Sequence, residues 1–294
     1  KNVIDSANEI LGWDLRAKMF TGTDEELRQT LVTQPAIFTV SSAAYEALSK
    51  RINLSDGKCA FSAGHSLGEY SALYSSKVFD FQTGLKLVEY RGRFIQECCG
   101  KYPGTMAAVL GMDRETLKSL CAECAGEKGV CEMVNFNSPG QIVVAGSKEA
   151  IETLAGKISA VPGAKAILLN VSGAFHSALM REAAQKMAET LKGAELKNAA
   201  VPVFTNVDAS AATQAEDFRR KLAAQVDHPV LWEDSVRKMA ESGAEAFIEV
   251  GPGKVLCGIL RKIDRKMKTL NVEDADSLNK NLKEMENLTN AIKG

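Results

Sequence analysis

One short motif constrains the fold of this chain most. Gly64-His65-Ser66-Leu67-Gly68 is a G-x-S-x-G sequence that lies between an apolar stretch at 58–62 and a helical pattern at 69–73. This context predicts a sharp strand-to-helix turn that holds the Ser66 hydroxyl outward, as a nucleophile rather than as part of a merely structural turn. The N–H of Leu67, at the start of the new helix, would then point at an incoming oxyanion.

Strand and helix patterns alternate along the chain, which predicts an α/β fold with a mostly parallel sheet and an α/β-hydrolase-like core. Between 105 and 169 the predicted order is β-α-β-β-α-β, the order of a ferredoxin-like unit. We therefore expect a small ferredoxin-like subdomain at 104–171, inserted in a large catalytic domain formed by 1–103 and 172–294. Helices are predicted within 1–31 and over 36–48, 82–98, 114–124, 148–158 and 177–191, and strands over 58–62, 106–110, 131–134, 141–145, 166–169, 201–205 and 246–250.

The charge balance excludes several classes of partner. Lys and Arg total 36 and Asp and Glu total 37, a net charge of −1, so no overall charge favours nucleic acid or an anionic membrane. No apolar run reaches the roughly 18 residues of a membrane span, and the first residues lack a signal-peptide pattern. With 45% hydrophobic residues, the composition is that of a soluble globular protein.

Seven cysteines are scattered along the chain, unlike the dense, even-numbered framework of a small secreted protein. Cys121 and Cys124 form a C-x-x-C pair, and Cys131 follows in the same region. A zinc or redox site there would need further ligands at regular spacing, and no histidine lies nearby. We therefore predict free thiols in a reducing cytoplasm and no bound metal.

The three histidines of the chain are the candidates for the base that Ser66 needs. His65 lies inside the motif, where its side chain should point away from that of Ser66, so we interpret it as structural. His228 precedes Pro229 near a predicted helix end and should be exposed. His176 lies in a loop after a predicted strand, at the sheet edge where α/β active sites form. His176 is therefore the predicted base.

Arg91 falls on the apolar face of the helix predicted over 82–98. That face is formed by Leu85, Val88 and Ile95. A buried arginine needs an anion, which could be one of the protein's own carboxylates or a carboxylate or phosphate of a substrate. The residues alone favour neither partner. Arg93 falls instead between Glu89 and Glu97, which predicts a solvated ion-pair face.

Five ordered motifs resemble those of malonyl-CoA:acyl carrier protein transacylases. The segment from Gly64 to Leu73 resembles the nucleophile motif of that family. The other four are Val88-Glu89-Tyr90-Arg91-Gly92, Asn135-x-Asn137-Ser138-Pro139-x-Gln141-Ile142-Val143, Gly173-Ala174-Phe175-His176-Ser177 and Glu249-Val250-Gly251-Pro252-Gly253-Lys254-Val255-Leu256. They extend along nearly the whole chain, whose length suits a stand-alone enzyme of fatty acid synthesis.

The resemblance implies a Ser–His dyad, with Ser66 as nucleophile and His176 as base. In the family a main-chain carbonyl orients this histidine, and the matching position here is Gln225. Leu67 keeps the oxyanion role that its position predicts. These four residues are the expected catalytic set.

The same resemblance assigns substrate contacts. Arg91 matches the arginine that clamps the malonyl carboxylate, and Phe175 is similar to the malonyl-selecting version of its loop. Asn137, in the third motif, is expected to contact the substrate. Basic residues near the Gly-Pro-Gly turn are candidates for docking the acidic carrier protein, against plain solvation; these are Lys254, Arg261 and Lys262.

The implied activity is ping-pong transfer of malonyl from malonyl-CoA, through malonyl-Ser66, to the phosphopantetheine thiol of acyl carrier protein. The CoA thioester is a substrate, so no cofactor is expected, and we expect a monomer. The family begins with a β-strand and a Gly-Gln-Gly-x-Gln loop that supplies an oxyanion-hole N–H. This chain begins within the helix that follows, so that strand and loop are expected to be missing from it.

Two other functions remain open from the residues. A serine esterase or thioesterase on a similar turn would need an acidic partner for His176 and would release free acid. A non-catalytic binder of CoA or of a carrier protein would keep its binding when Ser66 is replaced by alanine.

Overall fold

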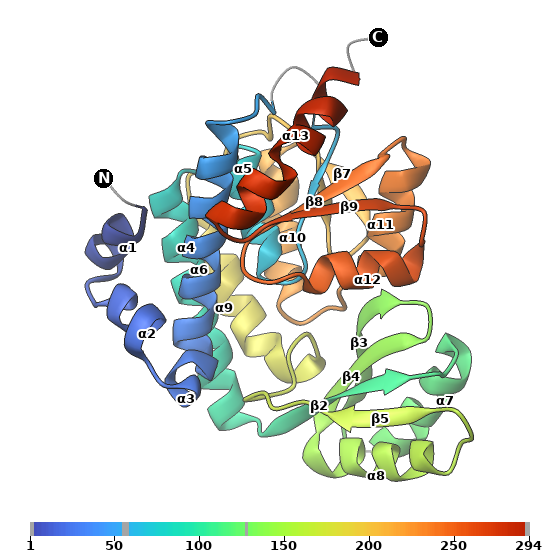
Figure 1. The fold of residues 1–294 in the computed structure, drawn as a ribbon. Coiled ribbons are helices and arrows are strands. Elements are labelled where there is room, and N and C mark those ends of the chain that lie inside the picture. Colours follow the sequence, from blue (N-terminus) through green and yellow to red (C-terminus); the bar gives the residue numbers. More distant parts are fainter. Residues whose placement is uncertain (1–2, 55–58, 127–128, 292–294) are drawn as a thin grey trace.

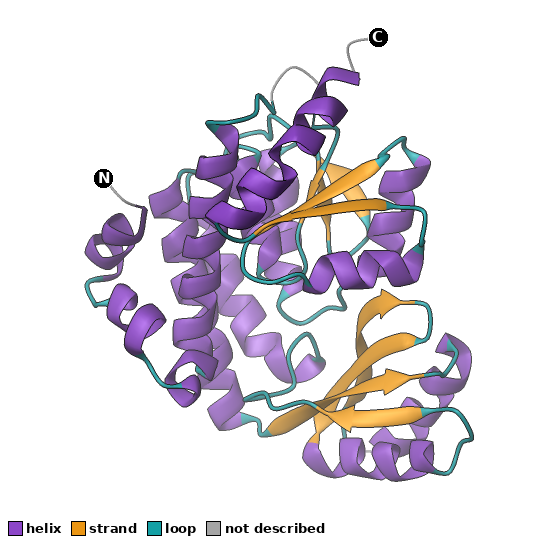
Figure 2. Cartoon of the chain, viewed as in Figure 1, coloured by secondary structure: helices purple, strands orange, loops and turns teal. Residues whose placement is uncertain are grey.

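The computed structural model describes residues 3–54, 59–126 and 129–291. The start of the helical region predicted from Lys1, and Lys58 of the strand predicted over 58–62, lie outside these residues. The chain forms a mixed α/β fold in which the strands gather in two groups, each with helices packed against it (Figure 2). None of the helices in the described parts combines the length and apolar character that crossing a bilayer requires.

Four helices precede the G-x-S-x-G motif: α1 (Val3–Leu11), α2 (Leu15–Thr21), α3 (Asp24–Arg28) and α4 (Thr30–Ser49). The side chain of Asp14 caps α2 by accepting from the N–H of Ala17, and Thr23 caps α3 through a capping box with Glu26. The α4 helix begins six residues before the predicted start at 36. The helix continues through Pro35, whose fixed φ suits a helix, at the cost of the hydrogen bond to the Leu31 carbonyl and of crowding between that carbonyl and the proline ring.

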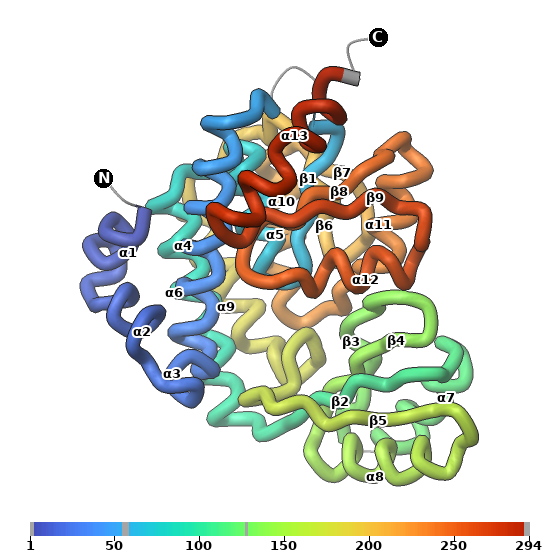
Figure 3. Tube along the Cα trace, in the orientation of Figure 1, coloured from blue at the N-terminus to red at the C-terminus, as the bar shows by residue number. Residues whose placement is uncertain are grey.

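A three-stranded sheet carries the motif: β1 (Ser62–Ala63), β6 (Val203–Thr205) and β7 (Ser210–Ala212), in the order β1-β6-β7. The strand predicted over 58–62 is only β1, because its pairing with β6 begins at Ser62 opposite Val203. Helix α5 (Gly68–Ser75) follows the motif as predicted. The path of the chain through these elements can be followed in Figure 3.

A separate two-stranded parallel sheet joins β8 (Ala246–Val250) to β9 (Lys268–Val272), with α12 (Val255–Ile263) between them in sequence. The large region of the described chain therefore does not contain the predicted single, mostly parallel sheet. Its strands form two small sheets, and β6 and β7 pair antiparallel because a short turn joins them directly. This region also contains α10 (Ala215–Gln225), α11 (Trp232–Glu241) and α13 (Ala275–Ala291).

The second group of strands forms an antiparallel four-stranded sheet in the order β3-β4-β2-β5, at the lower right of Figure 1. Its strands are β2 (Gly104–Leu110), β3 (Cys131–Ser138), β4 (Gln141–Ser147) and β5 (Lys165–Leu168), and its helices are α7 (Arg114–Ala125) and α8 (Lys148–Ser159). The predicted β-α-β-β-α-β order is observed. A hydrophobic cluster drawn entirely from this segment packs the sheet against its helices.

Helix α6 (Phe81–Lys101) lies between α4 and α9 (Arg181–Lys192) and buries its predicted apolar face in the largest hydrophobic cluster. Arg91 is on that face and only 3% exposed. Arg93 is exposed, as predicted, and its charge acts on the Glu89 carboxyl, although no direct ion pair joins it to Glu89 or Glu97 in the described chain. Its guanidinium lies over the Tyr90 and Phe94 rings instead, because stacking on these rings still leaves the charge in water.

Candidate functional site

The turn at Ser66 is strained and tightly packed. Ser66 has a φ of 51°, a left-handed conformation that is costly for a residue with a side chain. Gly64 is required by close approach, because a Cβ there would lie 1.9 Å from the carbonyl oxygen of Gly68. A Cβ at Gly68 would meet no described atom within 4 Å. Among the described residues, the turn therefore needs a residue without a side chain at position 64, whereas position 68 has room for one.

Asn206 fastens this turn from the carboxyl end of β6. Its Oδ1 accepts from the N–H of Ser66 at 2.7 Å, and its Nδ2 donates to the carbonyl oxygen of Gly64, also at 2.7 Å. The parallel pairing of β1 with β6 brings the two strand ends together. The Asn206 side chain therefore bridges the turn across His65 and fixes the backbone that leads into Ser66.

Ser66 Oγ and His176 Nε2 lie 2.7 Å apart, although 110 positions separate them in sequence. His176 Nδ1 lies 2.7 Å from the main-chain oxygen of Gln225. A carbonyl oxygen can only accept, so Nδ1 carries the proton. In the neutral imidazole, Nε2 is then free to accept the proton of the Ser66 hydroxyl. This is the geometry that a general base requires.

Burial, together with the nearby Arg91 charge, lowers the pKa of His176 to about 3, so the imidazole is neutral at physiological pH. An unfolded chain would protonate this histidine near its ordinary pKa of about 6.5. Between these values the unfolded state binds the extra proton, so the stabilising contribution is complete above pH 6.5 and is lost as the pH falls toward 3.

We therefore expect acidification from pH 7 to pH 5 to destabilise the wild type more than the His176→Gln variant. Urea unfolding of both proteins at the two pH values measures the difference. Equal losses of unfolding free energy in the two proteins would contradict a neutral, buried His176.

Arg91 reaches the same serine from α6. Its Nη2 donates to Ser66 Oγ at 3.0 Å and to Oε1 of Gln225 at 3.1 Å, and its Nη1 donates to Oε1 of Gln34 at 2.6 Å. Burial lowers the pKa of this guanidinium, which nevertheless stays charged because the pKa of arginine is so high. Within the described residues Arg91 forms no direct ion pair: its hydrogen-bond partners are neutral, and the buried Glu69 carboxyl acts on its charge without touching it.

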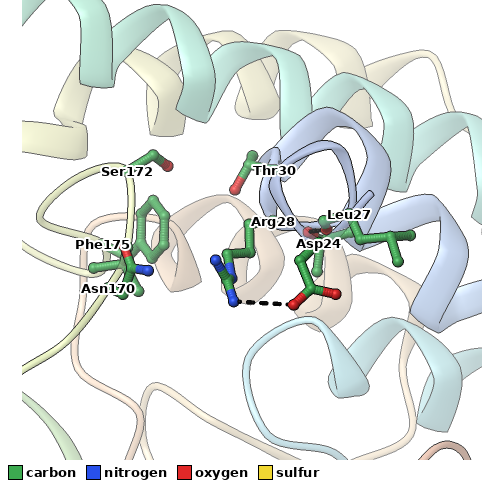
Figure 4. Close-up of a pocket in the computed structure, with 9 residues that line it drawn as sticks. Asp24, Leu27, Arg28, Thr30, Asn170, Ser172 and Phe175 are labelled. Atoms are coloured by element: carbon green, nitrogen blue, oxygen red, sulfur yellow. Dashed lines mark hydrogen bonds and ion pairs between the residues drawn. The ribbon is translucent and has the colours of Figure 1, made fainter. Parts of the chain in front are cut away.

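A small cavity of about 30 Å³ lies where these side chains meet. It is lined by Gln34, Ser66, Arg91, Ile95, Phe175, His176 and Val226. Phe175 also lines a larger pocket of about 430 Å³ beside α3 and the segment 170–172. Figure 4 shows Phe175 and Asn170 on one side of this outer pocket and Asp24 on the other, with Arg28 between them and hydrogen-bonded to Asp24.

The remaining predicted site residues lie at different distances from this centre. The N–H of Leu67 stands just before α5 and donates to no acceptor among the described residues. Asn137 is buried and its Oδ1 lies 2.8 Å from Nε2 of His65, whose ring contacts Trp232 edge-on. Asn137 does not line the small cavity. His228 is exposed, as predicted.

Sequence reasoning missed three polar residues that contact the site. Gln34 binds Arg91, Asn206 holds the turn, and Glu69 contacts both Asn206 and Gln225. Asn206 follows a predicted strand directly, and this position could have been recognised as the carboxyl edge of a sheet. Gln34 lies before the helix start predicted at 36, so the sequence pattern did not indicate that its side chain is buried.

All seven cysteines are free thiols. In the described part of the chain, no group of three or more His, Cys, Asp or Glu side chains is arranged to hold a metal ion. Cys121 and Cys131 are both buried in the cluster of the four-stranded sheet.

Comparison with known proteins gives a consistent result. Residues 2–293 match the family model described as acyl transferase domain. The chain is 41% identical over 279 residues to the malonyl CoA-acyl carrier protein transacylase of Bacillus subtilis (strain 168), covering 95% of this chain and 86% of that protein. It is 44% identical over 258 residues to the protein of the same name from Escherichia coli (strain K12), covering 87% and 82%.

A solved structure of a type II PKS acyl-carrier protein in complex with its malonyl-transacylase is also similar. It matches this chain with a TM-score of 0.89 and 37% identity, over 96% of this chain and 90% of the other.

Proposed function

Because this chain belongs to the acyl transferase family, we propose that it transfers malonyl from malonyl-CoA to acyl carrier protein through a malonyl-Ser66 intermediate, for fatty acid synthesis. The observation that carries the proposal is one serine oxygen that contacts both an imidazole and a buried guanidinium. The first contact suits activation of the hydroxyl, and the second suits a cargo that ends in a carboxylate.

In the first half-reaction, His176 takes the proton from Ser66 as Oγ attacks the thioester carbonyl. The resulting oxyanion accepts from the N–H of Leu67, whose position at the start of α5 supports this role. The C–S bond then breaks, CoA leaves as its thiol after taking the proton from His176, and Ser66 carries the malonyl ester. The Gln225 carbonyl keeps the imidazole oriented throughout.

In the second half-reaction the phosphopantetheine thiol of acyl carrier protein gives its proton to His176 and attacks the ester. The ester C–O bond then breaks, Ser66 Oγ takes the proton back from His176, and malonyl leaves as a thioester on the carrier. No cofactor takes part in these steps.

Selection of malonyl follows from the position of Arg91. One methylene separates the two carboxyl carbons of malonyl, so a group that binds the free carboxylate must lie beside the nucleophile. Arg91 lies beside Ser66 Oγ, and its planar guanidinium can donate two parallel hydrogen bonds to a carboxylate. An acetyl group would leave this cation without an anion, and a site built for a polar group rejects an analogue that lacks it. Phe175, at the cavity wall, is proposed to limit acyl size, and Asn137 to contact the thioester arm.

We also propose the finer architecture. The β3-β4-β2-β5 sheet with α7 and α8 would be a ferredoxin-like subdomain at 104–171, supported by its separate hydrophobic cluster. The regions 1–103 and 172–294 would form an α/β-hydrolase-like catalytic domain around the Ser66 turn. The seven free thiols support the expected cytoplasmic setting, and a monomer remains our expectation.

Radiolabelled malonyl-CoA tests the function directly. After brief incubation and denaturation, we expect label on the peptide that contains Ser66, and release of that label onto added holo-acyl carrier protein. Rapid conversion of the label to free malonate would favour the thioesterase instead, although the His176 partner is a carbonyl rather than the carboxylate of a triad. Absence of any adduct would favour a binding protein.

A further inference from the structure

Glu69 is a buried carboxylate beside the catalytic residues that the steps above do not use. It is 1% exposed, and a carboxylate in such a place is costly unless hydrogen bonds compensate for the lost water. Its Oε2 accepts from the main-chain N–H of Asn206 at 3.0 Å and from Nε2 of Gln225 at 2.9 Å. Its Oε1 has no hydrogen-bond partner among the residues that the structure describes. A single oxygen therefore makes both contacts.

These two contacts hold two supports of Ser66. Asn206 binds the N–H of Ser66 and the carbonyl of Gly64. The side chain of Gln225 donates also to the carbonyl of Ser66 at 2.8 Å and accepts from Arg91. Glu69 thus holds in place the residues that contact the serine backbone.

Gln225 also connects Glu69 to the base and to the cation. Its side chain lies between the Glu69 carboxylate and the Arg91 guanidinium, and its main-chain oxygen accepts from His176. Movement of the Gln225 side chain would therefore disturb Ser66 and Arg91, two of the groups that meet in the cavity. A displacement of about 1 Å at such a site can cost a hundredfold in rate.

We propose that Glu69 is a positioning residue for the transfer reaction, whose Oε2 fixes Asn206 and Gln225 and so sets the geometry of Ser66 and Arg91. The inference rests on the proposed function. This positioning role requires an acceptor oxygen at Oε2 rather than a negative charge. Burial raises the pKa of Glu69 to about 7, so both the ionised and the neutral carboxyl are present near neutral pH.

Two substitutions separate the oxygen from the charge. Glu69→Gln keeps an acceptor oxygen at the Oε2 position and places its NH₂ where Oε1 has no partner, whereas Glu69→Met keeps the length and removes both hydrogen bonds. The measurement is the rate constant of Ser66 acylation at saturating malonyl-CoA, in rapid-quench experiments with labelled substrate. We expect Glu69→Met to lower it by about tenfold or more and Glu69→Gln to stay within about threefold of the wild type.

Gln225→Met provides a second test that does not depend on whether Glu69→Met folds. It removes the donor to Glu69 and leaves the main-chain carbonyl in place. If Glu69 acts in part through this side chain, Gln225→Met should also lower the rate, and the Glu69→Met/Gln225→Met double variant should lose less than the product of the two single losses.

Glu249→Met is the matched control. The Glu249 carboxylate also accepts two N–H groups, those of Leu256 and Cys257, but in the described chain neither of these two residues lines the cavity or hydrogen-bonds to Ser66, His176 or Arg91. We expect its acylation rate to stay within about twofold of the wild type, whatever its effect on unfolding by urea.

The positioning role is overturned if Glu69→Met acylates Ser66 at the wild-type rate, if Glu69→Gln is as slow as Glu69→Met, or if the two methionine substitutions multiply. Failure of the proposed function looks different, because wild-type protein would then carry no label on Ser66.

Discussion

Ser66→Ala is expected to abolish formation of the malonyl-enzyme, and His176→Ala to slow it by about 10²- to 10⁴-fold. The reason is the 2.7 Å contact between Oγ and Nε2, with Nδ1 fixed as the donor to the Gln225 carbonyl. Without the imidazole, the hydroxyl must lose its proton to water, while the contacts proposed for the Leu67 N–H and for Arg91 remain.

The two residues should behave as one catalytic unit. Steady-state transfer of malonyl to acyl carrier protein by each single variant and by the double variant tests this. We expect the double variant to be no slower than Ser66→Ala, because either loss removes the activated nucleophile. A Ser66→Ala protein that still transfers malonyl would remove the acyl-serine mechanism altogether.

Arg91→Ala should lower kcat/KM for malonyl-CoA by about 10²- to 10³-fold, the usual cost of deleting one partner of a buried charged pair. Use of acetyl-CoA should fall much less, because acetyl has no carboxylate to bind. The ratio of malonyl to acetyl transfer is therefore the diagnostic quantity. Arg91→Lys keeps a charge without the fork and should give an intermediate ratio.

The neighbouring Arg93→Ala is the control for this experiment. It removes an arginine from the same helix, but one that is exposed and stacked on Tyr90 and Phe94. Its malonyl-to-acetyl ratio should equal that of the wild type. An unchanged ratio in Arg91→Ala would show that the carboxylate is bound elsewhere.

The sequence predicted the parts of this site that depend on local pattern. A serine between an apolar stretch and a helix was expected to lie on a sharp turn, and its φ of 51° agrees. Arg91 was expected on a buried face because apolar residues recur around it at helical spacing. The β-α-β-β-α-β order came from alternation alone. Each of these features is set by residues that are close in sequence.

Features that depend on contacts between distant segments could not be predicted in the same way. Whether Arg91 paired with a protein carboxylate was open, because Gln34 is 57 positions away and Gln225 is 134. The roles of Asn206 and Glu69 depend on the pairing of β1 with β6, which joins strands of two and three residues. Strands so short leave almost no periodicity in the sequence. Without that signal the sequence could not show which strands pair, so one mostly parallel sheet was expected where two small sheets form.

The acceptor that orients His176 belongs to the main chain, where α10 ends. A helix leaves its last carbonyls without intrahelical donors, and the Gln225 oxygen is one of these. Every amino acid supplies that oxygen, so no replacement at position 225 deletes it. The orientation of the His176 imidazole therefore depends on where α10 ends. An insertion or deletion within α10 would shift the acceptor oxygen along the helix axis by about 1.5 Å per residue. Such a change would misalign the His176 imidazole, whereas a point mutation at position 225 leaves the acceptor oxygen in place.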